Sequence, residues 1–535
     1  MAASLPPQSV PTKPIILGAI DIGTNSIHLV VVKIEPQFPS FSIIAKEKDT
    51  VRLGDRDLHT GNLTPEAIAR ALATLRRCQD LALSFGAKHL LAVATSATRE
   101  APNGQEFIQQ VERELGLQID LISGPEEARR IYLGVLSGWE FNEQPQVIID
   151  IGGGSTELIL CDRHDTRYLS STKVGAVRLT QEFIHSDPVS PAELTYLRAY
   201  VRGMLERSIE QIRSQIQPGE TPCLIGTSGT IETLALLQAR TVSEEPPSPL
   251  NGYTISREQL NQLTEQLAQL PYGDRALFPG MSERRAEIIV AGAVILLEAM
   301  EMLGMAEISI CERALREGII VDWMLTHRLI ADKLHYQSEV RDRSVYSIAQ
   351  KYQVNMDYSE RVAKFAVDLF DQLQGKLHFW NEQERDILWA AGMLHNSGLY
   401  ISHAAHHKHS YYLIRHAELL GYTELEVELI ANIARYHRKS KPKKKHPNYH
   451  PLTKPNRQRV DQLSAILRLA VALDRRQIGA ISQVNAAYNP HHQILQLHLT
   501  PTDPTDPCEL ECWSLNYKKD VFEEEFHLRV EGLVG

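Results

Sequence analysis

The sequence predicts an α/β protein with two similar halves around a cleft, followed by a helical domain and a small α+β cap. An apolar strand pattern that ends in Asp-Ile-Gly occurs twice, at Asp21 and at Asp150. Strand and helix patterns alternate between these copies, which is typical of wound α/β sheets. The copies lie 129 positions apart, too far for a solenoid repeat and suitable for two domain halves. Ligands of open α/β sheets bind at the carboxyl ends of strands, so we expect the cleft there.

The first half is predicted from residues 15–130, after a flexible N-terminus at 1–14 that lacks the apolar core of a signal peptide. Residues 14–34 show two apolar strand patterns separated by small and polar residues. A helical apolar period over 64–86 ends at a glycine and predicts an amphipathic helix. The apolar residues of 89–100 predict the next strand.

The second half, residues 131–325, contains the segment DIGGGSTELIL at 150–160. Its consecutive glycines let the chain turn tightly and let backbone N–H groups approach a ligand closely. Concave groups of backbone N–H suit anions, phosphate above all. Asp150 and Glu157 flank this turn, and their charges are compatible with a phosphate only if a cation such as Mg²⁺ lies between. The alternative is a glycine-rich β-turn with a solvated Glu157.

Small-residue loops follow predicted strands at three places in the chain, and three such loops are far more specific than one. We expect them to hold phosphate oxygens from both sides of the cleft. The predicted loop residues are Gly23, Thr24, Asn25, Ser26, Gly152, Gly153, Gly154, Ser155, Thr156, Gly226, Thr227, Ser228 and Gly229.

The composition is that of an ordinary soluble globular protein, with 43% hydrophobic and 23% charged residues. The net charge of −10 argues against general polyanion binding, so any such site must be a local patch. The longest apolar run, 288–297, is too short to span a bilayer and predicts a buried helix. Six scattered cysteines form no metal-type motif, so we expect reduced thiols in a cytoplasmic protein without a membrane partner.

The C-terminal part is predicted to be a helical domain at 326–480 and an α+β cap at 481–535. Residues 435–459 contain ten Lys or Arg, no acid and four prolines, so we expect a surface loop. This loop is either merely solvated, or binds nucleic acid, which its few aromatic residues disfavour, or holds a phosphate chain that leaves the cleft. On the last hypothesis the contact residues are Lys441, Lys443, Lys444 and Lys445.

The sequence resembles the exopolyphosphatase/guanosine pentaphosphatase family, within the actin and sugar-kinase superfamily. The matching segments are DIGTNSIHLVV, ATSATRE, SGPEEARRIYLGV, DIGGGSTEL, GTSGT and ERRAEIIVAG, and further on HHKHSYYLI, YHRKSKPKKKHP and WSLNYKKDVFEEEF. The resemblance implies two ribonuclease-H-like lobes of the actin/sugar-kinase type. It also implies Mg²⁺-dependent hydrolysis of the terminal phosphoryl group of polyphosphate, or of the 5′ γ-phosphate of guanosine pentaphosphate. A homodimer is expected on the same ground.

The resemblance also implies the role of individual acids. Glu127 matches the general base of the family, and a carboxylate can orient and deprotonate water. Asp150 and Glu157 match the metal-linked acids, and Asp21 is a further candidate for the metal. From the residues alone, Glu127 is explained equally well as an acid favoured at a helix N-terminus, a role that also suits Glu126.

Ser96 and Arg99 match phosphate-binding positions of the family. Arginine can grip a phosphate with two hydrogen bonds in a way that lysine cannot. The alternative for Arg99 is a surface arginine at the end of a strand.

The helical domain resembles the HD metal-dependent phosphohydrolase bundle, but its metal ligands are replaced. Tyr358 stands at the first His position, His395-Asn396 at the His-Asp pair, and Val471 at the later Asp, one turn before Asp474. Tyrosine and asparagine are poor substitutes for such ligands. We therefore expect a degenerate HD-like domain that serves as a scaffold.

Two further clusters are interpreted as packing. If the segment 403–409 is helical, His403, His406 and His407 share one face, but no acids nearby complete a metal shell, and phosphate contact by His407 to His409 is the alternative. Cys508 and Cys512 are interpreted as packing and not as a disulfide or ligand pair.

The sequence thus favours an exopolyphosphatase that uses water activated by Glu127, with guanosine pentaphosphate hydrolysis at the same site as the alternative. A sugar-kinase-like phosphotransferase is less favoured because it leaves the basic loop unexplained. A non-catalytic polyphosphate or nucleotide sensor requires that Glu127 be dispensable. The expected ligands are Mg²⁺, inorganic polyphosphate and guanosine pentaphosphate, and nucleic acid is not expected.

Overall fold

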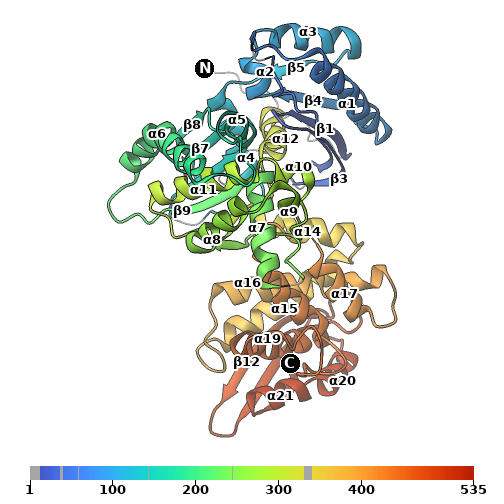
Figure 1. Ribbon diagram of the computed structural model, residues 1–535. Helices are drawn as coiled ribbons and strands as arrows, with labels where there is room; N and C mark the ends of the chain where they lie inside the picture. The colour runs from blue at the N-terminus through green and yellow to red at the C-terminus, as the bar shows by residue number, and fades with distance from the viewer. Residues whose placement is uncertain are drawn as a thin grey trace, which may run out of the picture. The chain divides into compact units, whose positions relative to one another are not determined.

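The computed structural model describes residues 13–36, 40–57, 59–141, 144–243, 245–330, 340–417 and 419–535. Residues 1–12 of the predicted flexible N-terminus lie outside the described residues. The chain divides into two compact units, Met1–Val340 and Arg341–Gly535, each with its own hydrophobic core (Figure 1).

The first unit contains two mixed β-sheets of matching topology. The strand orders are β3-β2-β1-β4-β5 and β10-β11-β9-β6-β7-β8. In each sheet, three antiparallel strands, β1 to β3 or β6 to β8, continue into parallel strands. This repetition confirms the two similar α/β halves predicted from the Asp-Ile-Gly copies. The strands are β1 (Ile15–Ile22), β2 (Ile27–Glu35), β3 (Ser40–Asp49), β4 (His89–Ala94), β5 (Ile119–Leu121), β6 (Gln146–Ile151), β7 (Thr156–Cys161), β8 (Thr166–Thr172), β9 (Cys223–Thr227), β10 (Thr254–Ser256) and β11 (Glu307–Ile310).

Helix α1 confirms the helix predicted for 64–86. Thr64 caps its N-terminus by accepting a hydrogen bond from the Ala67 amide (3.2 Å). The strand predicted for 89–100 is wrong in its second half. Its neighbour β1 ends at Ile22, so β4 has no partner beyond Ala94 and the chain turns into α2. The helices of this unit are α1 (Pro65–Ser84), α2 (Ser96–Glu100), α3 (Gly104–Leu115), α4 (Gly124–Leu136), α5 (Ala176–Phe183), α6 (Pro191–Gln215), α7 (Gly229–Val242), α8 (Arg257–Gln269), α9 (Tyr272–Ala276), α10 (Glu283–Ala286), α11 (Ile289–Leu303) and α12 (Leu315–Thr326).

The apolar run at 288–297 forms most of α11, whose residues from Ile289 to Met300 are buried, as predicted. The carboxylate of Glu298 is buried as well, and it is paired with Arg198 (2.9 Å) and Arg202 of α6. Among the described residues, no helix combines the length and the apolar character that a membrane span requires.

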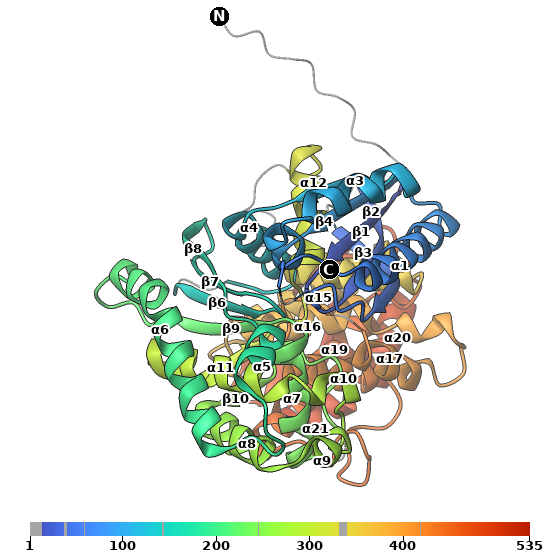
Figure 2. The ribbon, with the colours of Figure 1, turned by 45° about the horizontal axis from the view of Figure 1, so that its top comes forward.

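Helices α4 and α12 cross in direct backbone contact and lie side by side in Figure 2. A Cβ atom at Gly134 would overlap the Ala314 carbonyl oxygen, and one at Gly318 would overlap the Arg130 carbonyl oxygen. Only glycine permits this approach. Side chains of both helices share one core with strands of both sheets. The boundary predicted between residues 130 and 131 therefore falls inside α4, a helix that packs against both halves.

The second unit is a helical domain whose core also takes in a three-stranded sheet of order β12-β13-β14. Val484, Leu495 and Val530 of the sheet pack in the same cluster as Leu369 and Leu388 of the helices, so the predicted bundle and cap form one body. Its elements are α14 (Val340–Lys351), α15 (Met356–Leu373), α16 (Glu382–Leu394), η1 (Ser397–Tyr400), α17 (His406–Arg415), α18 (Glu424–Arg435), α19 (Lys454–Leu473), β12 (Ile481–Asn489), β13 (Ile494–Pro501), α20 (Glu509–Lys518), α21 (Asp520–Phe526) and β14 (Arg529–Val534).

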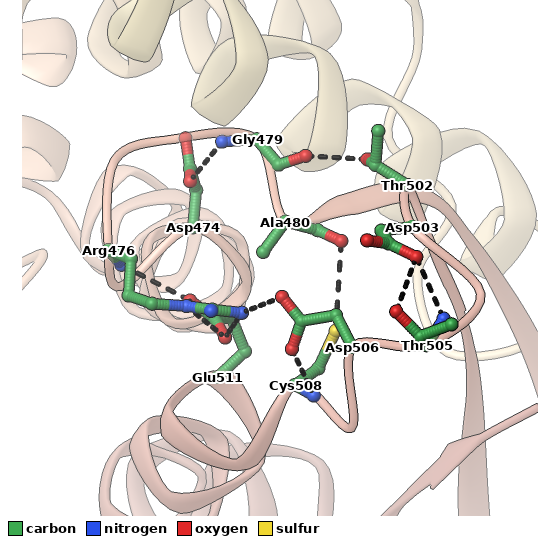
Figure 3. A network of polar contacts seen from close by, with 10 residues as sticks. All are labelled: Asp474, Arg476, Gly479, Ala480, Thr502, Asp503, Thr505, Asp506, Cys508 and Glu511. Atoms are coloured by element: carbon green, nitrogen blue, oxygen red, sulfur yellow. Dashed lines mark hydrogen bonds and ion pairs between the residues drawn. The ribbon is translucent and has the colours of Figure 1, made fainter.

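A polar network joins the end of α19 to α20 (Figure 3). The Asp474 carboxylate accepts hydrogen bonds from the Gly479 amide (3.0 Å) and from Arg361 (2.7 Å). Arg476 donates to Glu511 (2.9 Å) and Asp506 (2.8 Å). Both oxygens of Asp474 are thus used to hold the chain as it leaves α19.

The contact between α4 and α12 predicts that an added methyl group there destabilises the first unit. We expect Gly318→Ala to lower its free energy of unfolding by about 1–3 kcal/mol, because helix backbones must move apart. Gly203→Ala is the control, since Gly203 lies in α6 with nothing near its added Cβ. That change should stabilise by about 0.5–1 kcal/mol. Urea unfolding midpoints of both variants check this, and equal midpoints would contradict it.

Candidate active site

The three predicted loops meet in one cleft of the first unit, together with the predicted acids. The predicted residues that line it are Asp21, Gly23, Thr24, Asn25, Ser26, Ser96, Glu127, Asp150, Gly152, Gly153, Gly154, Ser155, Glu157, Ser228 and Gly229. The cleft is also lined by residues that the sequence reasoning did not single out, among them His28, Thr95, Thr230, Arg285 and Arg316.

The first two loops are equivalent hairpin turns that line the cleft and pack against each other. The Gly23 amide donates to the Ser26 carbonyl (3.1 Å), and the Gly152 amide donates to the Ser155 carbonyl (2.9 Å). A Cβ atom at Gly153 would lie 3.1 Å from the Cβ of Thr24. Gly153 and Gly154 are thus explained by the close approach of one turn to the other.

The third loop leads from β9 into α7. Ser228 has a positive φ (87°), and its hydroxyl donates to the Ile151 carbonyl (3.0 Å). The N-terminal residues of α7, Gly229 and Thr230, line the cleft. The unpaired amides and the dipole at a helix N-terminus favour an anion.

The structure separates the two acids that open α4. Glu127 is buried, lines the cleft and accepts a hydrogen bond from Arg99 (3.1 Å). Glu126 is half-exposed and binds Arg129 (2.7 Å) and Arg130 (2.8 Å) of its own helix. The acid that serves only the helix N-terminus at the surface is therefore Glu126 and not Glu127.

Arg99 is not a surface arginine at a strand end. It lies on α2 and donates to both the Ile122 carbonyl (2.7 Å) and Glu127. Because its guanidinium bridges these two groups, it holds the Glu127 carboxylate in position.

The acids of the cleft are crowded together in a low-dielectric environment. Burial, and then the Glu127 charge, raise the pKa of Asp150 to about 8. Burial, and then Asp150, raise the pKa of Glu157 to about 8, and burial raises that of Asp21 to about 6. Burial and the Glu157 charge raise the pKa of Glu127 well above its usual value. A cation among these groups would stabilise their charged forms.

The donors of this cluster are carboxylate oxygens, the ligands that Mg²⁺ prefers. In the described residues, no three His, Cys, Asp or Glu side chains are close enough to enclose an ion by themselves. Mg²⁺ usually retains waters and is held by one or two carboxylates plus substrate phosphates, so the acids present fit that ion.

Basic side chains gather near the N-terminus of α7. A Cβ atom at Gly229 would overlap Arg285, and it would lie 3.8 Å from the amine of Lys48. Arg316 contacts His28 (3.2 Å). Within the described ranges, Lys48, Arg285 and Arg316 form no ion pair with a carboxylate, although Arg316 is buried near Asp21 and Asp150. Of these three residues, only Arg285 lies in the segment ERRAEIIVAG, which the sequence analysis quoted as part of a family pattern.

Some predicted contact residues do not line the cleft. Thr156 donates to the Val174 carbonyl (2.5 Å), and Thr227 donates to the Arg313 carbonyl (2.8 Å). A Cβ at Gly226 would press on Ile308 (2.5 Å). These three residues support the loops from behind, so their roles are structural.

The four predicted lysines belong to the second unit. They lie in a segment without helix or strand between α18 and α19, which confirms the predicted loop. Lys441 pairs with Glu524, whereas Lys443, Lys444 and Lys445 are exposed.

Of the positions matched to HD metal ligands, Tyr358, His395 and Val471 are buried in the second unit, and Asn396 is half-buried. The rings of Tyr358 and His395 lie 5.5 Å apart, and the His395 ring contacts the Gly392 carbonyl (2.6 Å). Helix α17 begins only at His406, which stacks on His437 (5.5 Å between ring centroids), so His403 lies outside the helix and does not share a helical face with His406 and His407.

Solved structures share the fold of the first unit. An exopolyphosphatase from Cytophaga hutchinsonii is 27% identical, with a TM-score of 0.54 over 59% of this chain and 99% of its own. The Aquifex aeolicus member of the Ppx/GppA family is 28% identical, with a TM-score of 0.51 over the same shares.

Two relatives match across most of the chain. A guanosine-5'-triphosphate,3'-diphosphate pyrophosphatase of Aeromonas hydrophila is 30% identical over 414 residues, 77% of this chain and 79% of its own. The Vibrio campbellii protein of that name is 29% identical over 461 residues, 86% of this chain and 87% of its own. The pattern of the Ppx/GppA phosphatase family matches residues 30–327, and that of domain III of these phosphatases matches 340–519. With both patterns in order, and the glycine loops and Glu127 in one cleft, the chain belongs to the Ppx/GppA phosphatase family.

Proposed function

We propose that this phosphatase removes the 5′ γ-phosphoryl group of guanosine pentaphosphate, and that linear polyphosphate is its second substrate. The observation that carries the hydrolytic role is the buried carboxylate of Glu127, held by Arg99 beside two opposed phosphate-type loops. The order of substrates follows the relatives that match both units, which are named for the guanosine substrate. The sequence reasoning alone had favoured polyphosphate.

The proposed reaction is an in-line displacement by water. The turns at Gly23–Ser26 and Gly152–Ser155 hold the terminal phosphoryl group through backbone amides and hydroxyls. Glu127 orients the water and accepts its proton while the oxygen attacks phosphorus and the anhydride bond breaks. The remaining phosphates leave as an anion that Lys48, Arg285 and Arg316 stabilise.

Mg²⁺ fits this site, with Asp150 and Glu157 as its holders and Asp21 beside them. When bound, the ion supplies positive charge that offsets the phosphate oxygens and these acids. Arg99 keeps the Glu127 carboxylate directed at the cleft, so that its proton-accepting oxygen stays near the reacting group.

One assay separates the proposed substrates and the other reactions of this fold. Phosphate release is measured with guanosine pentaphosphate, long-chain polyphosphate, and ATP plus sugars, each with and without Mg²⁺. We expect the highest kcat/KM on guanosine pentaphosphate, measurable release from polyphosphate and no sugar phosphorylation. Turnover confined to polyphosphate would reverse the order of substrates, and phosphoryl transfer to a sugar would overturn the hydrolase.

Glu127→Gln should lower kcat on both substrates by about 10²–10⁴-fold, the usual contribution of a general base. Substrate binding should remain, because the loops are untouched. Glu126→Gln is the matched control, since its partners are Arg129 and Arg130 of the same helix. Steady-state rates and equilibrium binding of both variants check this, and a Glu127→Gln rate within a few-fold of wild type would remove Glu127 from the chemistry.

The metal role predicts a pH-dependent stabilisation by Mg²⁺. In metal-free protein, the raised pKa values of Asp150 and Glu157, each about 8, mean that the folded state binds extra protons. The stability from these groups is complete below their unfolded pKa of about 4 and falls as the pH rises towards 8. Mg²⁺ binds the charged forms, so it should raise the thermal midpoint more at pH 8 than at pH 6.

Calorimetry in EDTA and in Mg²⁺ at both pH values measures this effect. Asp150→Asn should lose most of the pH-dependent part and should need more Mg²⁺ for half-maximal activity. Glu206→Gln, at an exposed position of α6, should behave as wild type. A Mg²⁺ shift that is the same at both pH values, or unchanged by Asp150→Asn, would contradict the proposed metal site.

The exposed lysines of the basic loop predict a dependence on chain length. Replacing Lys443, Lys444 and Lys445 with Gln should raise KM for long polyphosphate and flatten its salt dependence, because fewer counterions are released on binding. KM for tripolyphosphate and guanosine pentaphosphate should hardly change. Lys441→Gln is the control, since Glu524 already pairs with that lysine. An unchanged ratio of kcat/KM for long and short substrates at two salt concentrations would leave this loop a solvated surface.

A further inference from the structure

The consecutive glycines of the segment DIGGGSTELIL are held from one side by the start of helix α5. The first two residues of α5 donate their amides to the carbonyls of Gly152 and Gly153 (3.0 Å each). The third residue, Arg178, donates from Nε to the Gly154 carbonyl (3.0 Å). Successive carbonyls of the loop are therefore bound by successive residues of one helix.

The amides of the same peptides point the other way. In a trans peptide the N–H group points opposite to the C=O group, so the amides of Gly153, Gly154 and Ser155 point away from α5. All three residues line the cleft, and among the described residues their amides donate to no protein group. Successive amides that point in one direction form a binding site for an anion. The bonds from α5 thus direct these amides at the phosphoryl group of the proposed reaction.

The last of these bonds comes from a side chain and therefore depends on one residue. Arg178 also pairs with Glu100 of α2 (2.8 Å), a helix of the first half. The other oxygen of Glu100 accepts a hydrogen bond from the Ser96 hydroxyl (2.9 Å), which lies close to Gly154. The planar guanidinium makes both bonds in a fixed geometry. Arg178 therefore fixes the peptide between Gly154 and Ser155 and ties it to the first half.

We propose that Arg178 is a positioning residue of this phosphatase, which aims the Ser155 amide at the phosphoryl group that is transferred to water. The inference rests on the proposed function. Arg178 is half-buried and lines a separate cavity of ≈ 380 Å³, not the cleft, so it acts on the substrate only through the loop. The cations Lys48, Arg285 and Arg316 still attract the rest of the substrate when this amide is misplaced. The effect of Arg178 is therefore mainly on kcat and not on KM.

Steady-state kinetics on guanosine pentaphosphate and polyphosphate test this split. Arg178→Ala should lower kcat about 10²-fold, the effect of a displacement of about 1 Å at a reacting group, and should hardly change KM. Arg178→Lys should lose nearly as much, because one ammonium group cannot replace two directed bonds of a guanidinium. Arg207→Ala, at an exposed position of α6, is the control and should match wild type. A wild-type kcat in Arg178→Ala or in Arg178→Lys would overturn the proposal, as would a loss confined to KM.

Chemical rescue separates positioning from a general loss of folding. Removing the Arg178 side chain enlarges the cavity that it lines, so free guanidinium can enter and donate to the Gly154 carbonyl. Guanidinium, below the concentration that unfolds the protein, should restore part of the kcat of Arg178→Ala and should not raise that of wild type. Methylammonium, which lacks the planar set of donors, should restore nothing. Equal restoration by both ions, or none by guanidinium, would refute the positioning role.

Crystal structures of the variants test the geometry without turnover. In Arg178→Ala we expect the peptide between Gly154 and Ser155 to rotate or to take more than one orientation, whereas Arg207→Ala should keep the wild-type orientation. An unchanged peptide in Arg178→Ala would mean that the loop does not depend on Arg178, and the proposal fails. If wild type cleaves no substrate, the proposed function fails, and the orientation of this peptide alone decides whether Arg178 positions the Ser155 amide.

Discussion

The backbone contact between α4 and α12 at Gly134 and Gly318 is the constraint on which the site depends. The first turn of α4 carries Glu127, and the first turn of α12 carries Arg316, so one crossing fixes an acid and a cation of the cleft together. The same two helices pack in the core shared by both sheets, whose hairpin turns supply the opposed loops. A helix pair in van der Waals contact along its backbone has little freedom to slide, which makes the geometry of the cleft stiff at its base.

Without bound ions, the crowded like charges of the cleft raise the free energy of the folded protein. A bound cation and a bound anion would lower it. Acids with raised pKa values line the cleft together with Arg285 and Arg316, and Lys48 lies near Arg285; within the described ranges these three cations form no ion pair. Buried like charges cost free energy unless ions of the opposite sign complete the site. On the proposed function, a cation beside Asp150 and Glu157 and a polyphosphate anion beside the arginines would supply both, and metal binding would then favour substrate binding.

The second unit shows a different use of similar residue types. Asp474, beside a position matched to a metal ligand, instead accepts hydrogen bonds from Gly479 and Arg361. His395 and Tyr358 are buried in the core, where the His395 pKa is lowered to about 4 by burial. The ionisable groups of this region thus serve packing and connection, while the exposed positive charge is collected in the loop that contains Lys443 to Lys445.

The amino-acid sequence by itself determined the α/β class, the doubled Asp-Ile-Gly turn, the buried helix α11 and the basic loop, because each depends on local periodicity or on residues with strong backbone preferences. From the residues alone it left the base role and the helix-terminus role of Glu127 equally open, and it left a surface position as the alternative to phosphate binding for Arg99, since adjacent acids on a helix differ only in what lies opposite them. It also predicted a boundary inside α4 and a strand through α2, and it passed over Lys48, Arg285 and Arg316. Those matters were decided by tertiary structure alone, because burial, the end of a neighbouring strand and the convergence of distant side chains are properties of packing between segments far apart in the chain.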